Sequence, residues 1–327
     1  MLDVHRLRLL RELDRRGTLA AVARALSYSP SAISQQLTQL ETETGVALLE
    51  PAGRGVRLTP QARILVEHTE AILERLEEAE ADLRASLAEV RGTLRVASFQ
   101  SVLLALIPSV LTRLAERHPG LRVEIAHQEA GPAFAGLLAH EFDIVLGEDY
   151  PGTAHSPVAG ARTQLLANDE LFAVLPDHGR HALDSEPDAH LRLADLAGVP
   201  WIFDPADTGP GQWARNACRE AGFEPDVRYV ASDLLLQIHL AEAGLAAAVI
   251  PGLLLAAVPR PAARIMPLPG RPTRRLTTGV RAGAARHPAI RAFREALRQA
   301  VREASQDRAA SRDEARTSDI ETPEPAR

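Results

Sequence analysis

The chain contains no lysine and only one cysteine, Cys218, among its 327 residues. All 37 basic residues are therefore arginines, which excludes a phosphate-binding Gly-Lys-Ser/Thr loop. One thiol cannot form an intramolecular disulfide, so a redox switch built from two cysteines of this chain is excluded as well. Cys218 stands beside Ala217 in a helical pattern, and we expect it to pack in a core rather than to react.

Signals for secretion or membrane insertion are also missing. The first residues carry charges at Asp3, Arg6 and Arg8, which interrupt any signal-peptide pattern. The most apolar later stretch, residues 245–258, is too short to span a bilayer and contains Pro251. We therefore expect a cytoplasmic protein without a membrane partner.

Motifs of catalysis are absent too. The sequence has no Gly-x-Ser-x-Gly elbow and no dinucleotide-binding fingerprint, and its 11 histidines are scattered. We expect no catalytic residues, no metal site and no cofactor, and the chain is predicted not to be an enzyme. An α/β enzyme is the second hypothesis. A solute-binding protein is the third, although the missing signal peptide argues against it.

Charge is distributed unevenly along the chain. The formal net charge is −6, yet residues 1–63 hold nine arginines against six carboxylates. The remaining residues are acidic overall. A basic end on an acidic body is typical of a small DNA-binding module joined to a larger domain.

The basic end contains the pattern of a helix-turn-helix. Residues 2–13 form an apolar helical face that stops at Gly17, and Thr18 can cap a second helix. After a short break, Ser29 is a good N-cap for a third helix over residues 30–44, which begins with a proline. Two helices, a short turn and a third helix are the elements of this motif.

The third helix has two contrasting faces. Ile33, Leu37 and Leu40 share one face and would pack on the first two helices. The opposite face carries uncharged hydroxyl and amide groups, which can bond base edges in the major groove. An ordinary solvated face would instead carry pairs of opposite charges. The DNA-contacting residues expected here are Ser29, Ser31, Ser34, Gln35, Thr38 and Gln39.

A Gly-Arg-Gly segment follows the third helix. It places Arg54 at the tip of a predicted hairpin, with Arg57 on its second arm. Such a wing can set an arginine into the minor groove, so both arginines are expected to contact DNA. The alternative is a simple surface turn, but the position directly after a helix-turn-helix favours a wing.

These segments together resemble the N-terminal signature of LysR-type transcriptional regulators. The resemblance rests on residues 19–26, 29–37 and 58–60, and on Leu40, Glu41, Gly45, Leu48 and Leu49. The sequence departs from the family pattern at Leu49, Glu50 and Pro51, where a Phe, a polar residue and an Arg are usual. Thr38 or Gln39 also replaces a frequent basic residue. Fewer phosphate contacts would lower the affinity for each half-site.

Residues 60–91 predict one long, charged helix. Apolar or small residues recur in it at alternating steps of four and three, namely Leu65, Thr69, Ile72, Leu76, Ala79, Leu83, Ser86 and Val90. A stripe this narrow favours pairing of two chains over packing on the helix's own domain. A dimer would also place two DNA-binding helices on two half-sites.

Short apolar runs alternate with helical patterns over residues 93–304, which predicts an α/β domain with mostly parallel sheets. The runs that predict strands are residues 94–99, 121–126, 143–147, 171–176, 200–203, 227–230 and 246–251. Residues 243–251 most clearly resemble the LysR effector domain, which is similar to periplasmic binding proteins. That similarity implies two α/β subdomains, made of residues 93–165 with 267–304 and of residues 166–266. The predicted order is a winged helix-turn-helix over 1–59, a linker helix over 60–91, the effector domain over 92–304 and a disordered tail over 305–327.

The effector is expected between the two subdomains, at the carboxyl ends of strands. Ser101 begins a helix, where backbone N–H groups would favour an anion. Glu129 and Asp204 instead disfavour a dianion and suit an amine. Each candidate could equally serve as a cap or turn residue. The candidates are Ser98, Phe99, Gln100, Ser101, Gln128, Glu129, Phe203 and Asp204.

The resemblance implies a sequence-specific DNA-binding transcription regulator that responds to a small-molecule effector. Its expected partners are double-stranded promoter DNA with inverted half-sites, the effector, further copies of the chain in a homodimer or homotetramer, and RNA polymerase.

Overall fold

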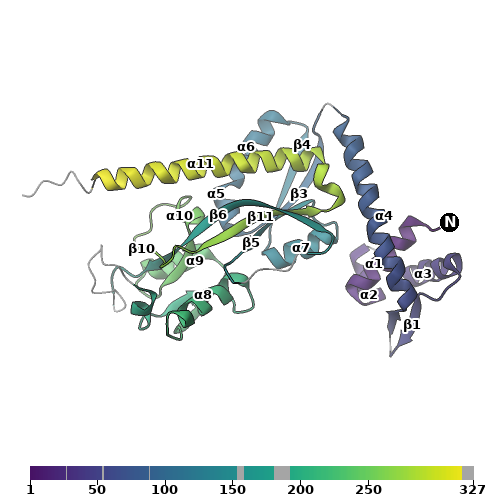
Figure 1. Cartoon of the computed structure of the whole chain (residues 1–327), viewed down its shortest axis with the longest axis horizontal. Helices are drawn as coiled ribbons and strands as arrows, with labels where there is room; N and C mark the ends of the chain where they lie inside the picture. The colour runs from purple at the N-terminus through teal and green to yellow at the C-terminus, as the bar shows by residue number, and fades with distance from the viewer. Residues whose placement is uncertain (27, 54, 88, 153–157, 180–191, 319–327) are drawn as a thin grey trace, which may run out of the picture. The chain divides into compact units, whose positions relative to one another are not determined.

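The computed structural model describes residues 1–26, 28–53, 55–87, 89–152, 158–179 and 192–318 (Figure 1). The chain divides into two compact units, Met1–Arg84 and Ala85–Arg327. In the described residues, no helix combines the length and the apolar character needed to cross a membrane.

The first unit begins with three short helices, α1 (Val4–Arg16), α2 (Leu19–Leu26) and α3 (Pro30–Thr44). Local side chains fix their ends: Asp3 accepts hydrogen bonds from the first N–H groups of α1, and Ser29 caps α3. Gly17 and Gly45 end α1 and α3 at φ angles of 73° and 70°, a region that glycine adopts without strain. The predicted helix-turn-helix is therefore present.

A hairpin and a long helix complete this unit. Strands β1 (Leu49–Ala52) and β2 (Gly55–Leu58) pair antiparallel, and α4 (Pro60–Ala85) follows directly. The core of the unit contains Ile33, Leu37 and Leu40, all fully buried, together with leucines of α1 and the start of α4. The apolar face predicted for the third helix thus packs inward.

Helix α4 ends at Ala85, six residues before the predicted end at residue 91. The chain has to turn at this point into strand β3 (Gly92–Ser98), which Gly92 enters with φ 106°. Val90, expected on the helical stripe, instead packs against the core of the second unit.

A mixed sheet forms the centre of the second unit. Its strand order is β10-β6-β11-β5-β3-β4, and β9 pairs with β6. The bounds are β4 (Leu121–His127), β5 (Ile144–Asp149), β6 (Ala161–Leu175), β9 (Ala248–Pro251), β10 (Arg264–Pro267) and β11 (Thr273–Arg281). Strands β7 (Trp201–Phe203) and β8 (Val227–Val230) form a separate parallel pair.

The prediction of mostly parallel sheets is wrong for half of this unit. Strands β3, β4 and β5 pair in parallel, but β11 runs antiparallel to both β5 and β6. Strands β9 and β10 also run antiparallel to β6. The reason is that β6 and β11 carry the chain between the two subdomains in opposite directions. Two neighbouring strands that run in opposite directions pair antiparallel.

Two subdomains share β6. Its first half packs on one core through Leu166 and Ala167, whereas Leu171, Ala173 and Leu175 belong to another core. The return crossing is the connection between β10 and β11. The chain therefore changes subdomain within β6 and again at residues 268–272.

Helices cover both subdomains. The first contains α5 (Gln100–Ala105), α6 (Ile107–Arg117), α7 (Ala130–Leu138), η2 (Gly283–Arg286) and α11 (Pro288–Ser318); α6 and α11 lie side by side (Figure 1). The second contains η1 (Leu193–Leu196), α8 (Gly209–Glu220), α9 (Leu234–Glu242) and α10 (Gly252–Leu255).

Helix α11 extends further than the sequence predicts. It continues to Ser318, so residues 305–318 are helical where a disordered tail was expected. No glycine or proline interrupts the sequence before Pro323, and adding residues to an existing helix costs little compared with nucleating one. Residues 319–327 lie outside the described part of the chain.

Candidate nucleic-acid interface and effector pocket

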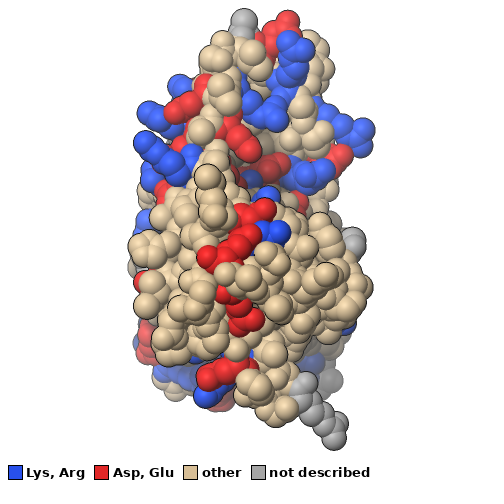
Figure 2. Space-filling view, turned by 90° about the vertical axis from the view of Figure 1, so that its right-hand side faces the viewer, with Lys and Arg blue, Asp and Glu red and all other residues tan. Residues whose placement is uncertain are grey.

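The exposed face of α3 is uncharged. Ser31, Ser34, Gln35, Thr38 and Gln39 are all exposed, opposite the buried face of the helix. Figure 2 views the structure from the side on which Figure 1 labels α3. The lower part of this view is mostly uncharged, and a narrow band of carboxylates crosses it. A face of small hydroxyl and amide groups on a rigid helix suits contact with base edges.

Ser29 has a structural role in addition to its exposure. Its Oγ accepts a hydrogen bond from the Ala32 N–H at 3.2 Å and lies 3.0 Å from the Ser31 Oγ. The N-cap role predicted for Ser29 is therefore confirmed, and a hydroxyl at a helix start can still meet a phosphate.

Hydrogen bonds to α1 and to the start of the wing hold α3 in place. Arg6 on α1 donates to the Gln36 Oε1 at 3.0 Å and forms an ion pair with Glu43. The Glu41 carboxylate accepts hydrogen bonds from the N–H groups of Leu48 and Leu49, at 2.8 and 3.0 Å. These contacts fix α1 and the wing against α3. They leave the exposed face of α3 unobstructed.

The two wing arginines differ in what the structure shows. Arg54 lies outside the described residues, between Gly53 and the start of β2. Arg57 is exposed on β2 and pairs with Glu50 at 2.6 Å across the hairpin. Glu50 is one of the departures from the family pattern, and it partly neutralises the arginine that was expected to contact DNA.

Helix α4 carries an exposed apolar stripe. Ile72, Leu76 and Leu83 are 37%, 43% and 71% exposed. At the other end of the predicted seam, Leu65 packs on the core of the first unit and Thr69 is buried. The seam is thus divided between the unit's own core and an outward stripe of Ile72, Leu76 and Leu83.

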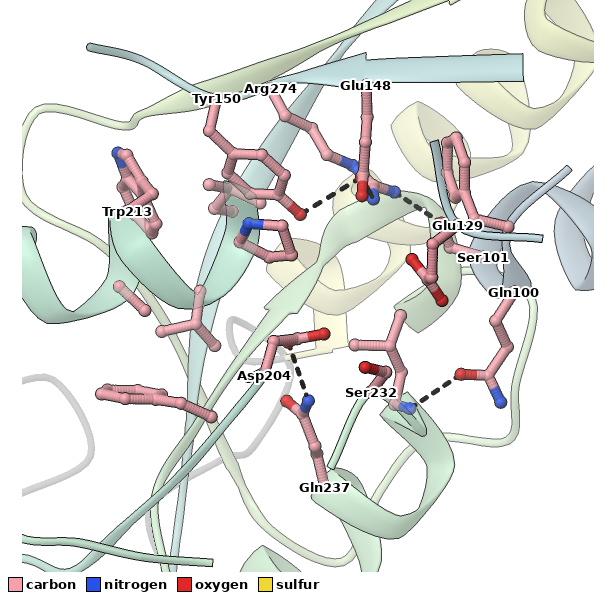
Figure 3. Close-up of a pocket in the computed structure, with 17 residues that line it drawn as sticks. Gln100, Ser101, Glu129, Glu148, Tyr150, Asp204, Trp213, Ser232, Gln237 and Arg274 are labelled. Carbon is pink, nitrogen blue, oxygen red and sulfur yellow. Dashed lines mark hydrogen bonds and ion pairs between the residues drawn. The ribbon is translucent and has the colours of Figure 1, made fainter. Parts of the chain in front are cut away.

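A pocket lies between the two subdomains of the second unit (Figure 3). It is lined by the ends of β3 and β5, the start of α5, β11, and residues of α8 and α9. Its free volume is about 30 Å³, enough for little more than a water molecule. The pocket is therefore largely filled by its own side chains.

Six of the eight residues predicted for the effector line this pocket, namely Phe99, Gln100, Ser101, Glu129, Phe203 and Asp204. Ser98 and Gln128 do not. Ser98 is buried, with its hydroxyl 3.5 Å from the Phe99 carbonyl oxygen, because successive side chains of a strand alternate between faces. Gln128 is exposed and contributes its N–H to the Ser98 carbonyl oxygen at 3.0 Å.

The LysR substrate binding domain family matches residues 87–302, and the family of bacterial regulatory helix-turn-helix proteins of the lysR type matches residues 4–63. The chain belongs to the LysR family. It is therefore a transcription regulator with a DNA-binding helix-turn-helix and an effector-binding domain.

Individual relatives agree with this assignment. The chain is 25% identical over 250 residues to the transcriptional dual regulator GltC of Bacillus subtilis, covering 76% of this chain and 81% of GltC. It is 26% identical over 252 residues to the regulator ClcR of Pseudomonas putida, covering 76% and 83%. Full-length OxyR of Pseudomonas aeruginosa shares the fold, with a TM-score of 0.63 and 19% identity over 91% of this chain and 95% of OxyR. Full-length BenM superposes with a TM-score of 0.54 and 21% identity, over 91% and 96% of the two chains.

A buried arginine sits at the rear of the pocket of this LysR-family regulator. Arg274 on β11 donates hydrogen bonds to the carboxylates of Glu148 at 2.6 Å and Asp169 at 2.9 Å, and to the Ser101 Oγ at 2.7 Å. Asp169 also accepts from the Leu253 N–H at 2.8 Å. Because these groups come from both subdomains, the network joins them at the crossing of the chain.

Two other carboxylates in the pocket have raised pKa values. Burial, together with the nearby charges of Glu148 and Glu129, raises the pKa of Asp204 to about 6, although a hydrogen bond from Gln237 at 3.0 Å opposes this shift. Burial and the charge of Glu148 also raise the pKa of Glu129. The pocket is therefore electrostatically negative when it is empty.

Gln100 connects the two subdomains at the edge of the pocket. Its Oε1 accepts from the Leu234 N–H at 2.7 Å, and its Nε2 donates to the Asp233 Oδ1 at 2.9 Å. Asp233 is also the N-cap of α9. One side chain of the first subdomain thus holds the start of a helix in the second.

Several pocket residues were missed by the sequence analysis, namely Glu148, Tyr150, Trp213, Ser232, Gln237 and Arg274. Glu148 directly follows the apolar run of residues 143–147, and Ser232 follows the predicted strand of residues 227–230. The rule that identified the other candidates could have identified these two. Arg274 gave no such signal, because its strand was not predicted. Within the described residues, no cluster of His, Cys, Asp or Glu side chains could hold a metal ion.

Proposed function

We propose that this LysR-family regulator recognises inverted DNA half-sites through α3 of two paired chains, and that an effector in the pocket between its subdomains controls this activity. The observation that carries the proposal is the exposed, uncharged face of α3, with Ser34 and Gln35 at its centre, on a helix whose other face is fully buried. The proposal includes no catalytic step.

The stripe on α4 supports a symmetric pair. Leu76 and Leu83 are exposed on a helix that is otherwise rich in carboxylates, and burying them against a second copy would gain about 25 cal/mol for each Å² of apolar surface. A homodimer would place one α3 on each half-site, and a homotetramer could contact two such sites. RNA polymerase is the further partner that regulation of transcription would involve.

The network at the pocket supports control by an effector. Gln100 and Arg274 both join the two subdomains, so a molecule that enters the pocket has to displace or strengthen contacts between them. A ligand can shift an equilibrium between two arrangements only through different contacts in each, and this pocket offers such contacts.

The test of the DNA-binding site is the variant Gln35→Ala. We expect it to weaken specific binding about 10-fold or more, since a lost amide–base contact costs about 1–3 kcal/mol, and to leave non-specific binding almost unchanged. Gel-shift titrations at fixed salt with specific and scrambled DNA measure both. The control is Gln212→Ala, an exposed glutamine on α8 of the effector unit. Equal losses on both DNAs would contradict a role of Gln35 in contacting bases.

A further inference from the structure

The charges of the effector pocket do not balance. Three carboxylates line it, from Glu129, Glu148 and Asp204, and Arg274 is the arginine that lines it. Arg274 is already paired with Glu148 and with Asp169 behind the pocket. Its single positive charge therefore neutralises neither Glu129 nor Asp204.

Other cations near the pocket do not supply the missing charge. Arg215 donates to the main-chain carbonyl oxygens of Asp204 and Gly211, at 3.0 and 2.8 Å, and lies over the Phe203 ring. His127 is exposed, and its Nε2 lies 3.8 Å from the Glu129 Oε1, where it is a counter-charge for Glu129 only when the imidazole is protonated. The carboxylate of Asp204 instead has the neutral amide of Gln237 as its hydrogen-bond partner.

The cationic donor that would hold an anion is already in use, because Arg274 is paired with Glu148 and Asp169. The Ser101 Oγ accepts from Arg274, which leaves its O–H as a neutral donor, and the Gln100 amide donates to Asp233. Helix α5, which begins here, has only six residues, so its N-terminus adds little positive potential. An anionic effector would thus meet carboxylates without a counter-charge.

The remaining surface of the pocket suits an organic cation. Figure 3 shows the carboxylates of Glu129 and Asp204 pointing into the same space, with Tyr150 beside it and Trp213 on the far side of Tyr150. Aromatic faces attract cations and can cover an aliphatic stem. A metal ion is disfavoured, because none of the acidic side chains in the described residues is clustered closely enough to ligate one.

We propose that the effector carries an ammonium or guanidinium group that binds between Glu129 and Asp204. This inference rests on the proposed role of the pocket as the effector site. The free volume of about 30 Å³ means that anything larger than the cationic head needs side chains of the pocket to move, and the contacts of Gln100 with Asp233 and Leu234 lie at its edge.

The first experiment compares matched probes on the full-length chain by isothermal titration calorimetry. The probes are n-butylammonium, n-butylguanidinium and 1,4-diammoniobutane as cations, 1-butanol as the neutral analogue and butanoate as the anion. We expect at least one cation to bind 10-fold or more tightly than butanol and butanoate. Butanoate or butanol binding as well as every cation, or no cation binding up to millimolar concentration, would overturn the proposal.

The second experiment needs no ligand. Glu129→Gln and Asp204→Asn each remove one unbalanced charge, so both should raise the melting temperature of the ligand-free chain at pH 8 and lower cation affinity at least 10-fold. The control is Glu220→Gln, an exposed residue of α8. If neither variant melts above the control, the carboxylates are already balanced and the proposal fails.

A parallel gel shift separates the two proposals. The pocket variants should bind specific DNA as the unmodified chain does. If the unmodified chain shows no sequence preference, the proposed regulator function fails, whereas the calorimetric comparison still decides whether the pocket takes a cation.

Discussion

At the scale of single residues, Arg274 joins the two subdomains. It is 1% exposed and contacts carboxylates from β5 and β6 as well as Ser101 of α5. Transfer of three charges from water into a protein interior is costly, and close pairing with hydrogen bonds is what compensates for that cost. Removal of the arginine would leave Glu148 and Asp169 buried without their partner.

We therefore expect Arg274→Met to lower the free energy of unfolding by about 3–5 kcal/mol, the usual effect of breaking a buried ion pair. Urea denaturation followed by circular dichroism measures it. Arg275→Met is the matched control, because Arg275 is the next residue on β11 and is exposed. A loss no greater than that of the control would show that Arg274 does not hold the subdomains together.

Asp204 gives a prediction about pH. The raised pKa of about 6 means that the folded chain binds a proton more tightly at this site than the unfolded chain, whose carboxyl has an ordinary pKa near 3.8. Below about pH 4, Asp204 therefore does not lower the free energy of unfolding. As the pH rises to about 6, it lowers the free energy of unfolding increasingly, by at most about 3 kcal/mol.

The corresponding variant, Asp204→Asn, should be more stable than the unmodified chain above pH 6, and this advantage should vanish towards pH 4. Urea denaturation at pH 4, 5, 6 and 7.5 tests this. A constant difference at every pH would show that Asp204 does not titrate with a raised pKa.

At the scale of elements, the sequence predicted those whose apolar pattern is regular. The helix-turn-helix, the hairpin and the strands β3, β4, β5, β7 and β8 were expected close to their observed positions. The first half of β6 and all of β11 were not. Asn168, Asp169 and Glu170 on β6 and Arg274 and Arg275 on β11 are unfavourable in isolated strands. Their places are set by pairing across the sheet, which sequence pattern alone does not show.

The same limit applies to the pocket. Residues at the ends of apolar strands, such as Phe99, Glu129 and Asp204, could be predicted because strand ends meet at one edge of a sheet. Gln237 and Trp213 lie on helices, and nothing local shows which way those helices face. Ser98 was wrongly expected to line the pocket. The face that a side chain takes near the end of a strand depends on the residue at which the strand stops.

Helix α4 gives a prediction about assembly. Leu76→Glu places a charge in the middle of the exposed stripe and should shift the chain from dimer, or higher oligomer, to monomer at micromolar concentration. Size-exclusion chromatography with light scattering measures the mass. Ala71→Glu, which adds the same charge at an exposed position beside the stripe, should not change it. An unchanged mass for Leu76→Glu would place the chain contacts elsewhere.

At the scale of the whole molecule, DNA recognition and effector binding lie in different units of one chain. The first unit has an α3 with an uncharged outer face, and the second has a small pocket between two subdomains that is lined by three carboxylates. A regulator needs both, and specific DNA binding is the more decisive of the two, since a pocket without it would only bind a solute.

The most direct measurement is an unbiased selection of double-stranded oligonucleotides with the full-length chain, followed by measurement of its mass on the selected DNA. We expect an enriched inverted repeat whose half-sites are about one helical turn apart, bound by an even number of chains, with an affinity at least about 10³-fold above that for random DNA. Recovery of sequences with no shared motif, or binding of a single chain without preference, would contradict it.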